Sequence, residues 1–255
     1  MALRTGHDLP DATIAQRYST LSSLGIWPAD FYARVLDAAG TLEGRRVLEI
    51  GCGRGGLLAA LSTRGAAEVQ GVDFVETYVA EAAQRGGPNV RVRTANLAEA
   101  LPYPAGAFDV VFAMEVLEHL KVPERCLGEV HRVLSPGGRL VLSIPNATAF
   151  APFHRLGSVL PGRWLKQKLL PYEHPSNTEQ PIDTMYTYRE ILALVARAGF
   201  VVERQSGYRY FRYALGFPIL RSLYTPWAPQ LERWLERHGW QRFAYHLILR
   251  CRPSG

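Results

Sequence analysis

Two hydrophobic patterns alternate along the chain from residue 45 to residue 144. Five apolar runs have the length of strands: 46–50, 68–72, 90–93, 108–114 and 139–144. Three segments between or beside them have the apolar spacing of helices: 57–64, 75–85 and 123–134. Strands that alternate with helices predict parallel βαβ units joined by right-handed crossovers. This part of the chain therefore predicts a doubly wound α/β core.

Two irregular segments follow this core. Residues 145–186 carry six prolines between positions 145 and 185 and have no clean hydrophobic period. A helix is expected at 188–198 and a sixth strand from residue 199. Residues 210–242 are again irregular and precede a seventh strand at 243–251. We interpret the two irregular segments as insertions that form a lid.

The first 44 residues predict two helices, at 12–21 and 28–39, which form an N-terminal helical cap. An α/β domain can use all 255 residues of the chain. We therefore expect one domain, residues 1–255, with residues 45–145 as its ligand-binding core. Its fold class is a Rossmann-like, seven-stranded, mostly parallel sheet with the cap and two C-terminal insertions.

The composition excludes two classes of protein. With 47% hydrophobic and 11% aromatic residues, the chain has too much apolar material to be mainly disordered. No window approaches 18 uninterrupted apolar residues, and the N-terminus has no apolar signal region. The three cysteines, Cys52, Cys126 and Cys251, lie far apart and have no metal-binding spacing. We expect a cytoplasmic protein without disulfides.

The positive charge of the chain is concentrated at one end. From residue 200 onward there are nine arginines and three glutamates, among many tyrosines, tryptophans and phenylalanines. Such a segment suits a peripheral membrane contact, an anionic substrate or a nucleic acid. It is equally compatible with a solvated, arginine-rich surface.

A glycine-rich turn follows the first strand of the core. The sequence from 47 to 56 reads VLEIGCGRGG, and its glycines allow a ligand to approach the backbone closely. Gly51, Gly53 and Gly56 also satisfy GxGxxG, so a nicotinamide dinucleotide is an alternative ligand. Glu49 disfavours that alternative, because a carboxylate before the glycines suits an amine and a sulfonium better than a pyrophosphate.

Polar residues also end the next two strands. Asp73 is placed to accept hydrogen bonds from ribose hydroxyls, and its alternative role is to cap the following helix. Phe74 is expected to pack on an adenine ring. Asn96 is expected to accept from the adenine amino group, with a backbone N–H at Leu97 meeting the ring; its alternative role is to form a turn.

Five motifs in register carry a family resemblance. They are VLEIGCGRGG at 47–56, GVDF at 71–74, NL at 96–97, the stretch from LPYP to EVLEHL at 101–120, and LSPGGRL at 134–140. Their order and spacing resemble the class I S-adenosylmethionine-dependent methyltransferases, in particular the branch of the ubiquinone and menaquinone pathway enzymes. The resemblance covers residues 45–145 and, more weakly, 188–202. It implies S-adenosyl-L-methionine as the cofactor.

The resemblance also implies roles for individual residues. The loop Gly51-Cys52-Gly53 and Glu49 are implied to contact the methionine part of the cofactor, and Asp73 its ribose. Asn96 stands where the family usually has an aspartate, which removes a charge but keeps an acceptor. Three further residues are implied to line the site: Tyr18, which closes over the cofactor, and Met114 and Glu115, between cofactor and acceptor.

The motif Glu115-x-x-Glu118-His119 is the candidate catalytic element. On a helix these three side chains would share about one face, and His119 is the best candidate for a general base, with Glu115 beside it. In some relatives the pattern is associated with a divalent metal, but that needs a later histidine. Neither His154 nor His174 lies in a convincing copy of that motif, so we expect no metal. Substrate orientation and structural capping remain alternative roles.

The expected reaction is methyl transfer to a small molecule, at a hydroxyl oxygen of an aromatic, lipid-like or sugar-containing metabolite. The insertions should form the acceptor pocket, because they are rich in aromatic rings and arginines: Trp164, Tyr172, Tyr186, Tyr208, Tyr210, Phe211, Trp227, Arg209, Arg212 and Arg221. Two alternatives stay open, an RNA 2′-O-methyltransferase and a non-catalytic cofactor-binding regulator. No RNA-binding module is appended, which disfavours a nucleic-acid partner.

Overall fold

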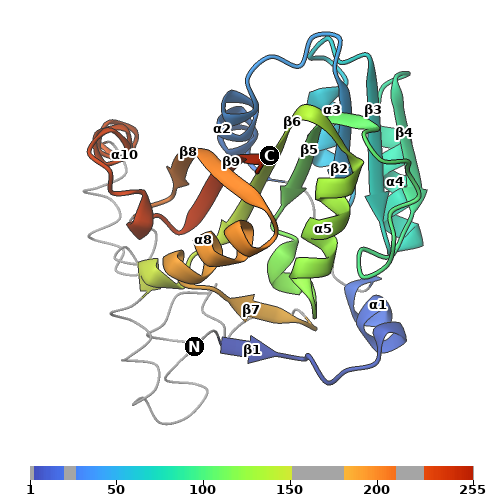
Figure 1. The fold of residues 1–255 in the computed structure, drawn as a ribbon, viewed down its shortest axis with the longest axis horizontal. Coiled ribbons are helices and arrows are strands. Elements are labelled where there is room, and N and C mark those ends of the chain that lie inside the picture. The colour runs from blue at the N-terminus through green and yellow to red at the C-terminus, as the bar shows by residue number, and fades with distance from the viewer. Residues whose placement is uncertain (1–2, 20–26, 151–180, 211–226, 255) are drawn as a thin grey trace.

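A central sheet of seven strands organises the protein (Figure 1). The computed structural model describes residues 3–19, 27–150, 181–210 and 227–254. The strands are β2 (Arg46–Ile50), β3 (Glu68–Asp73), β4 (Val90–Thr94), β5 (Phe108–Met114), β6 (Leu134–Pro145), β8 (Phe200–Tyr208) and β9 (His246–Pro253). Their order is β4-β3-β2-β5-β6-β9-β8, and β9 runs in the direction opposite to the other six strands. The predicted seven-stranded, mostly parallel sheet is confirmed.

Helices cover both faces of the sheet. One face packs against α2 (Ala29–Ala39), α3 (Gly56–Leu61) and α4 (Glu76–Arg85), and the other against α5 (Pro123–Val133) and α8 (Tyr188–Arg197). Along β5, Val110 and Phe112 belong to the first core and Val111 and Ala113 to the second. Both faces are buried, which explains the continuous apolar sequence of this strand.

A small group of elements lies at the carboxyl ends of the parallel strands (Figure 1). Strands β1 (Leu3–Thr5) and β7 (Asp183–Met185) form an antiparallel pair beside α1 (Asp11–Ser19). This pair was not predicted, whereas the two helices of the cap appear as α1 and α2. The described end of the first insertion therefore lies at the carboxyl ends of the parallel strands.

Two strand boundaries differ from those predicted. β6 begins at Leu134 rather than at 139, so α5 ends earlier than expected. β9 begins at His246, because residues 241–243 form the 3-10 helix η4 (Gln241–Phe243). The side-chain amide of Asn146 donates to the carbonyl oxygens of Arg242 and Ala244 at 2.8 and 2.9 Å. These bonds hold the segment in a turn until it reaches the strand.

The described part of the second insertion lies at the β8 edge of the sheet. Helix α10 (Ala228–Arg237) packs there beside α2, and its Leu235 contacts Tyr210 and Ala244. Residues 151–180 and 211–226 lie outside the described residues; they include His154, Trp164, Tyr172, His174, Phe211, Arg212 and Arg221. The role of the insertions as a lid thus stays a prediction. Across the described ranges, no helix has the length and apolarity that a membrane span needs.

Candidate active site

The glycine-rich turn after β2 has left-handed backbone at Gly51, Gly53 and Gly55. Gly51 has φ +64° and Gly53 has φ +50°, which L side chains rarely adopt. A Cβ atom on Gly51 would lie 2.5 Å from the side chain of Val116. The N–H of Cys52 donates to the carbonyl of Val72 at 3.0 Å, which ties the turn to β3. The turn is therefore packed between β3 and the segment after β5.

Asp73, the last residue of β3, joins this turn to the next helix. One carboxylate oxygen accepts the N–H of Gly53 at 2.9 Å, and the other accepts the N–H of Val75 at 3.0 Å. The side chain is buried, and this burial raises its pKa. No side-chain hydrogen bond caps the N-terminus of α4, so the alternative role predicted as a helix cap is limited to this one bond from Val75 to Asp73. Its contact with a ribose stays a prediction.

Glu49 lies on the α2 and α3 face of β2 with 3% of its surface exposed. A backbone N–H from Leu58 bonds to its carboxylate, while Oε2 has no hydrogen-bond partner among the described residues. Burial, and then the charge of Asp73, raise the pKa of Glu49 well above its usual range. A buried carboxylate oxygen without a donor is an unusual cost in a folded protein.

The predicted adenine contacts have other partners in this structure. Asn96 forms a turn: its Oδ1 accepts the N–H of Ala98 at 3.0 Å, and its Nδ2 donates to Glu99 at 3.1 Å. This is the turn-forming role that was the alternative. Leu97 and Met114 are buried in the two cores. Adenine contacts at Asn96 and Leu97, and the cofactor contact at Met114, remain predictions.

Tyr18 on α1 lies between two predicted site residues. Its ring makes edge contacts with Phe74 and His119, at centroid distances of 5.6 and 5.8 Å. Its hydroxyl donates to the carbonyl of Ile182 at 3.2 Å, and Tyr78 donates to its backbone carbonyl. Burial raises the pKa of Tyr18, so the phenol stays protonated. Tyr18 thus reaches the end of β3, and its closure over the cofactor stays a prediction.

The expectation that Glu115, Glu118 and His119 share one helical face is wrong. Glu115 precedes the helix and has φ +54°, and only residues Leu117–His119 form the short 3-10 helix η1. Because of this left-handed backbone, the side chain of Glu115 takes a different direction from the side chains of Glu118 and His119. The three side chains consequently have different partners.

The two later residues of this motif are buried. The ring N–H at Nδ1 of His119 donates to the carbonyl of Ile182 at 2.8 Å, and burial lowers the pKa of His119. Glu118 is 1% exposed, and burial together with the nearby Glu115 raises its pKa well above its usual range. Its Oε1 lies 3.8 Å from Nε2 of His119. His119 is accordingly a neutral imidazole held by a backbone carbonyl.

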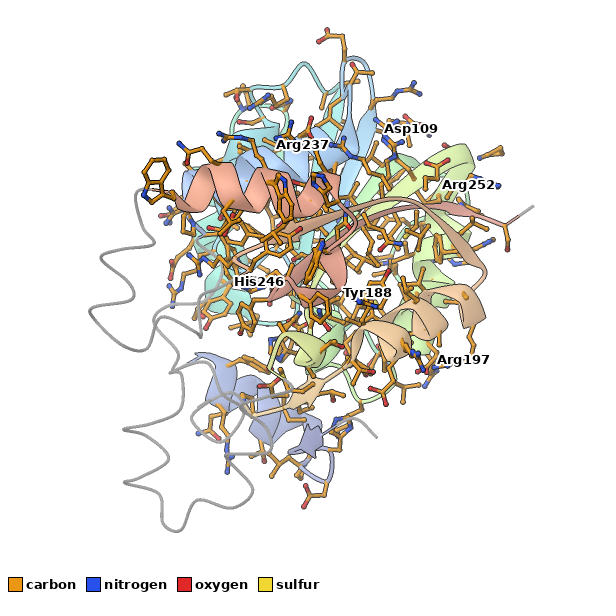
Figure 2. The ribbon with its side chains drawn as sticks, turned by 90° about the vertical axis from the view of Figure 1, so that its left-hand side faces the viewer. Asp109, Tyr188, Arg197, Arg237, His246 and Arg252 are labelled. Carbon is orange, nitrogen blue, oxygen red and sulfur yellow. The ribbon has the colours of Figure 1, made fainter. Side chains whose placement is uncertain are left out.

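Glu115 instead pairs with a histidine that the sequence reasoning missed. Ser143 donates its hydroxyl to Oε1 at 2.6 Å, and Nδ1 of His246 donates to Oε2 at 2.9 Å. His246 opens β9 and lies inside the molecule (Figure 2). The sequence signal for it is a histidine directly before the apolar run Leu247-Ile248-Leu249. Because β9 is antiparallel, its first residue reaches the carboxyl ends of the parallel strands.

Comparison with known proteins identifies the family. A family model described as a methyltransferase domain matches residues 48–142. Demethylmenaquinone methyltransferase from Thermus thermophilus is 33% identical over 207 residues, which cover 74% of this chain and 90% of that protein. The chain belongs to the S-adenosylmethionine-dependent methyltransferases. The predicted resemblance, the predicted cofactor and the prediction that the protein is an enzyme are confirmed.

One further relative by sequence and one solved structure are also similar to this methyltransferase. The ubiquinone biosynthesis O-methyltransferase of Bordetella avium is 35% identical over 115 residues, which cover 44% of this chain and 47% of that protein. This match therefore spans less than half of the relative. Magnesium protoporphyrin IX methyltransferase from Synechocystis, solved with bound SAH, has a TM-score of 0.57 and 20% identity, over 96% of this chain and 86% of that one. This likeness shows the fold.

The residues around the glycine turn fit the cofactor of a methyltransferase. Oε2 of Glu49 needs a donor, and the ammonium group of the methionine part would supply one. The turn itself carries no side chain at Gly51 or Gly53, so a ligand can approach its backbone. We expect Glu49, Gly51, Cys52 and Gly53 to hold the methionine part, and Asp73, Tyr18 and Phe74 the nucleoside.

The described part of the methyltransferase contains no side-chain arrangement that supports metal binding. Within those ranges, no group of three histidine, cysteine or acidic side chains is placed to hold an ion. Glu115 is bonded to Ser143 and His246, and His119 uses Nδ1 for a backbone carbonyl. The three described cysteines are free and buried.

Proposed function

We propose that this methyltransferase acts on a hydroxyl oxygen of a small aromatic metabolite, of the kind that precedes a quinone. One observation carries the proposal: the acid–base groups at the carboxyl edge of the sheet are enclosed by aromatic rings. His246 contacts Trp27 at a centroid distance of 5.2 Å, Tyr245 at 4.1 Å and Tyr208 at 5.9 Å. Rings suit an apolar or aromatic acceptor, and a hydroxyl acceptor needs a base.

The names of two relatives support this acceptor class. One is a demethylmenaquinone methyltransferase and the other a ubiquinone biosynthesis O-methyltransferase. Both names refer to quinones, and the second specifies transfer to oxygen. Lipid-like and sugar-containing acceptors also present hydroxyl groups, and they are the alternatives that the acceptor panel compares with the aromatic ones.

The chemistry follows from the cofactor. S-adenosylmethionine supplies an electrophilic methyl group: the acceptor oxygen bonds to the methyl carbon while the carbon–sulfur bond breaks and sulfur keeps its electron pair. The chain must orient the acceptor and exclude water, and such orientation contributes about 7–11 kcal/mol in model reactions. Tyr18 and Phe74 would shield the nucleoside part of the cofactor from water. His119 and Glu115, the predicted catalytic pair, lie at the edge where the acceptor would bind.

A panel of acceptors tests the proposal. Catechols, hydroquinones, prenylated hydroquinones, sugars, lipids and RNA are each incubated with the protein and S-adenosylmethionine. The expected result is release of S-adenosylhomocysteine with a phenolic or hydroquinone acceptor, and a methyl ether in the product by mass spectrometry. Turnover with RNA alone, or methylation at carbon alone, would contradict the proposal.

We also propose that α10 contacts a membrane surface, where a water-insoluble acceptor would be found. Trp227, Trp234 and Trp240 are 67%, 46% and 45% exposed, in or beside this helix. Arg233 and Arg237 are exposed on the same helix. Exposed tryptophans next to arginines suit the interface of an anionic bilayer.

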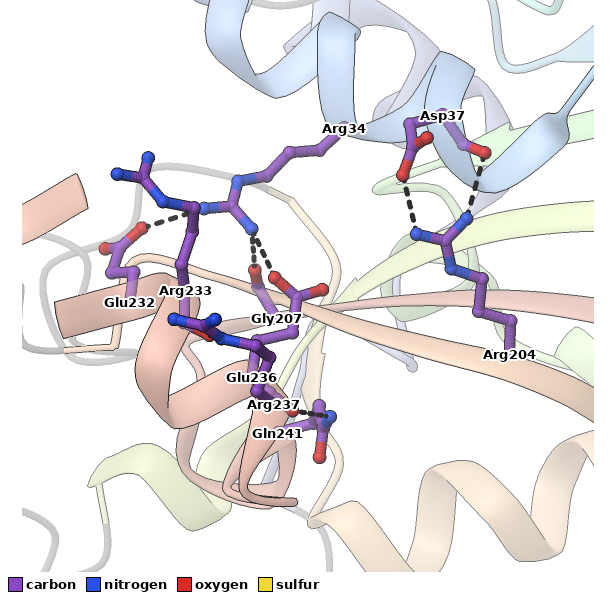
Figure 3. A network of polar contacts seen from close by, with 9 residues as sticks. All are labelled: Arg34, Asp37, Arg204, Gly207, Glu232, Arg233, Glu236, Arg237 and Gln241. Carbon is purple, nitrogen blue, oxygen red and sulfur yellow. Dashed lines mark hydrogen bonds and ion pairs between the residues drawn. The ribbon is translucent and has the colours of Figure 1, made fainter. Parts of the chain in front are cut away.

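The acidic residues of α10 do not oppose this contact, because they are turned inward. Glu232 and Glu236 both pair with Arg34 of α2, at 3.3 and 3.0 Å (Figure 3). Arg34 also donates to the carbonyl of Gly207. Both carboxylates of α10 are thus paired with Arg34, whereas Arg233, Trp234 and Arg237 are exposed.

Vesicle sedimentation tests the membrane contact. The protein should bind vesicles of phosphatidylglycerol more strongly than those of phosphatidylcholine. The double variant Arg233→Gln/Arg237→Gln should lose about 1 kcal/mol per arginine. Arg64→Gln/Arg91→Gln removes the same charge from exposed positions elsewhere and serves as the control. Equal losses in both double variants would show that net charge, and not α10, is responsible.

A further inference from the structure

We propose that His246, oriented by Glu115, is the base that accepts the proton of the acceptor hydroxyl. The proposal rests on the proposed function, since it concerns transfer to oxygen. The proposed base lies on β9 and is not part of the motif Glu115-x-x-Glu118-His119.

The pair has the geometry of an oriented imidazole. Nδ1 of His246 lies 2.9 Å from Oε2 of Glu115, and a carboxylate can only accept there, so Nδ1 carries the hydrogen. The other oxygen of Glu115 accepts the hydroxyl of Ser143 at 2.6 Å. The carboxylate is thus fixed from two sides, and it selects the tautomer whose Nε2 has a free lone pair.

Nε2 of His246 is the ring nitrogen that remains available to accept a proton. It is buried and has no hydrogen-bond partner among the described residues, in a side chain that is 2% exposed. Its surroundings are aromatic: the rings of Trp27, Phe31, Tyr208 and Tyr245 contact the imidazole. A buried acceptor without a donor is costly unless a ligand supplies one, and an acceptor hydroxyl does so.

The Glu115–His246 pair includes a residue in an unfavourable backbone conformation. Glu115 has φ +54°, a left-handed conformation that costs a non-glycine residue free energy. Asn146, which is fully buried, holds the turn before β9 through its bonds to Arg242 and Ala244, and its own N–H donates to Tyr245. Glu115 is therefore positioned by its backbone conformation, and His246 by the turn that Asn146 holds.

His246 is better suited to the proton than His119. When an imidazole accepts a proton inside a protein, the new charge needs a bonded anion. Nδ1 of His246 has the carboxylate of Glu115, whereas Nδ1 of His119 has the neutral carbonyl of Ile182, and burial lowers the pKa of His119. We assign His119 to holding Tyr18 and the segment at Ile182.

The proton moves as the methyl group is transferred. The acceptor O–H bond breaks, its electron pair remains on the oxygen that bonds to the methyl carbon, and the proton passes to Nε2 of His246. Glu115 stabilises the resulting imidazolium through Nδ1–H. When the products leave, the proton passes from Nε2 to water, and the neutral imidazole is restored.

Other titratable groups face His246. Tyr208 of β8 and Tyr245 contact the ring, and Asp30 of α2 accepts the hydroxyl of Tyr208 at 3.1 Å. Burial and Asp30 raise the pKa of Tyr208 to about 12, so this phenol is not the base near neutral pH. Glu115 is the carboxylate bonded to the imidazole.

Kinetics on the acceptor found by the panel test the assignment. His246→Gln should lower kcat by about 10²–10⁴-fold, the usual worth of general acid–base catalysis, with little change in KM. Glu115→Gln should lower kcat less. His131→Gln, on α5, is the control and should keep the wild-type rate.

A second measurement does not depend on activity. In ¹⁵N-histidine spectra of the complex with S-adenosylhomocysteine, His246 should show the tautomer protonated at Nδ1, and Glu115→Gln should change its shifts. All variants should bind S-adenosylhomocysteine as wild type does, which shows that they fold.

The outcomes separate the two proposals. Wild-type kcat in His246→Gln, or an Nε2-protonated tautomer, would overturn the role of His246 and leave the acceptor class standing. If no hydroxyl acceptor is methylated, the proposed function fails, while the spectra still report whether the pair exists.

Discussion

Asp73 accepts the backbone N–H of Gly53, twenty residues earlier in the chain, at 2.9 Å. The contact couples the shape of the glycine turn to a buried carboxylate at the end of the neighbouring strand. Because the other oxygen accepts the N–H of Val75, one side chain is bonded both to the glycine turn and to the residue that precedes α4, on the two sides of the predicted cofactor site. Loss of this carboxylate should therefore affect binding directly and through the turn.

Asp73→Ala should weaken S-adenosylmethionine binding by about 1.5–3 kcal/mol, the usual worth of hydrogen bonds to a charged group. Isothermal titration calorimetry of the purified variant measures the change. Glu76→Ala, in the first turn of the same helix, is the control and should bind normally. An unchanged dissociation constant in Asp73→Ala would mean that the residue only serves the start of α4.

Gly51→Ala should damage both the fold and the site. Its Cβ would lie 2.5 Å from Val116, at a residue with φ +64°. Strained conformations of this kind cost about 1–3 kcal/mol each. Gly128→Ala is the control: nothing lies within 4 Å of its added Cβ, and an alanine inside α5 should stabilise by roughly 0.5–1 kcal/mol. Thermal unfolding and calorimetry measure the two effects, and equal unfolding temperatures would contradict the prediction.

The proximity of the glycine turn and Asp73 could be predicted because its determinants are local. Gly51 and Gly53 follow a strand directly, and Asp73 follows the next one, so the parallel sheet brings them together whatever the rest of the chain does. The same locality made Asn96 ambiguous. A short polar side chain after a strand forms a turn as readily as it binds a ligand, and the turn is what the structure contains.

The acid–base pair could not be predicted because it depends on long-range contacts. Glu115 and His246 are 131 residues apart, and their meeting requires the antiparallel insertion of β9 beside β6. The periodicity located the seventh strand without its direction. The spacing of Glu115, Glu118 and His119 predicts a shared helical face, but the left-handed backbone at Glu115 directs its side chain elsewhere.

Glu118 should make the stability of the protein depend on pH. Burial raises the pKa of Glu118, so the folded state keeps a proton that the unfolded state loses above about pH 4.3. Stability should therefore fall as the pH rises from this point toward the raised pKa. Glu118→Gln removes the ionisation without changing the shape, so its stability should depend less on pH and exceed that of wild type at alkaline pH.

Urea unfolding across this pH range measures the effect. Glu124→Gln, an exposed glutamate on α5, is the control and should follow the wild-type curve. A Glu118→Gln protein that is less stable than wild type at alkaline pH would show that Glu118 is stabilised there as an anion.

Chelation should leave the activity unchanged. A metal at the Glu115, Glu118 and His119 motif would need their side chains free and convergent, with a full ligand set. In the structure Glu115 is bonded to Ser143 and His246, and the pKa of Glu118 is raised, which favours its protonated form. Initial rates after dialysis against EDTA should match those of untreated protein. If turnover is lost in EDTA and restored by Mg²⁺ or Mn²⁺, these side chains must rearrange into ligands.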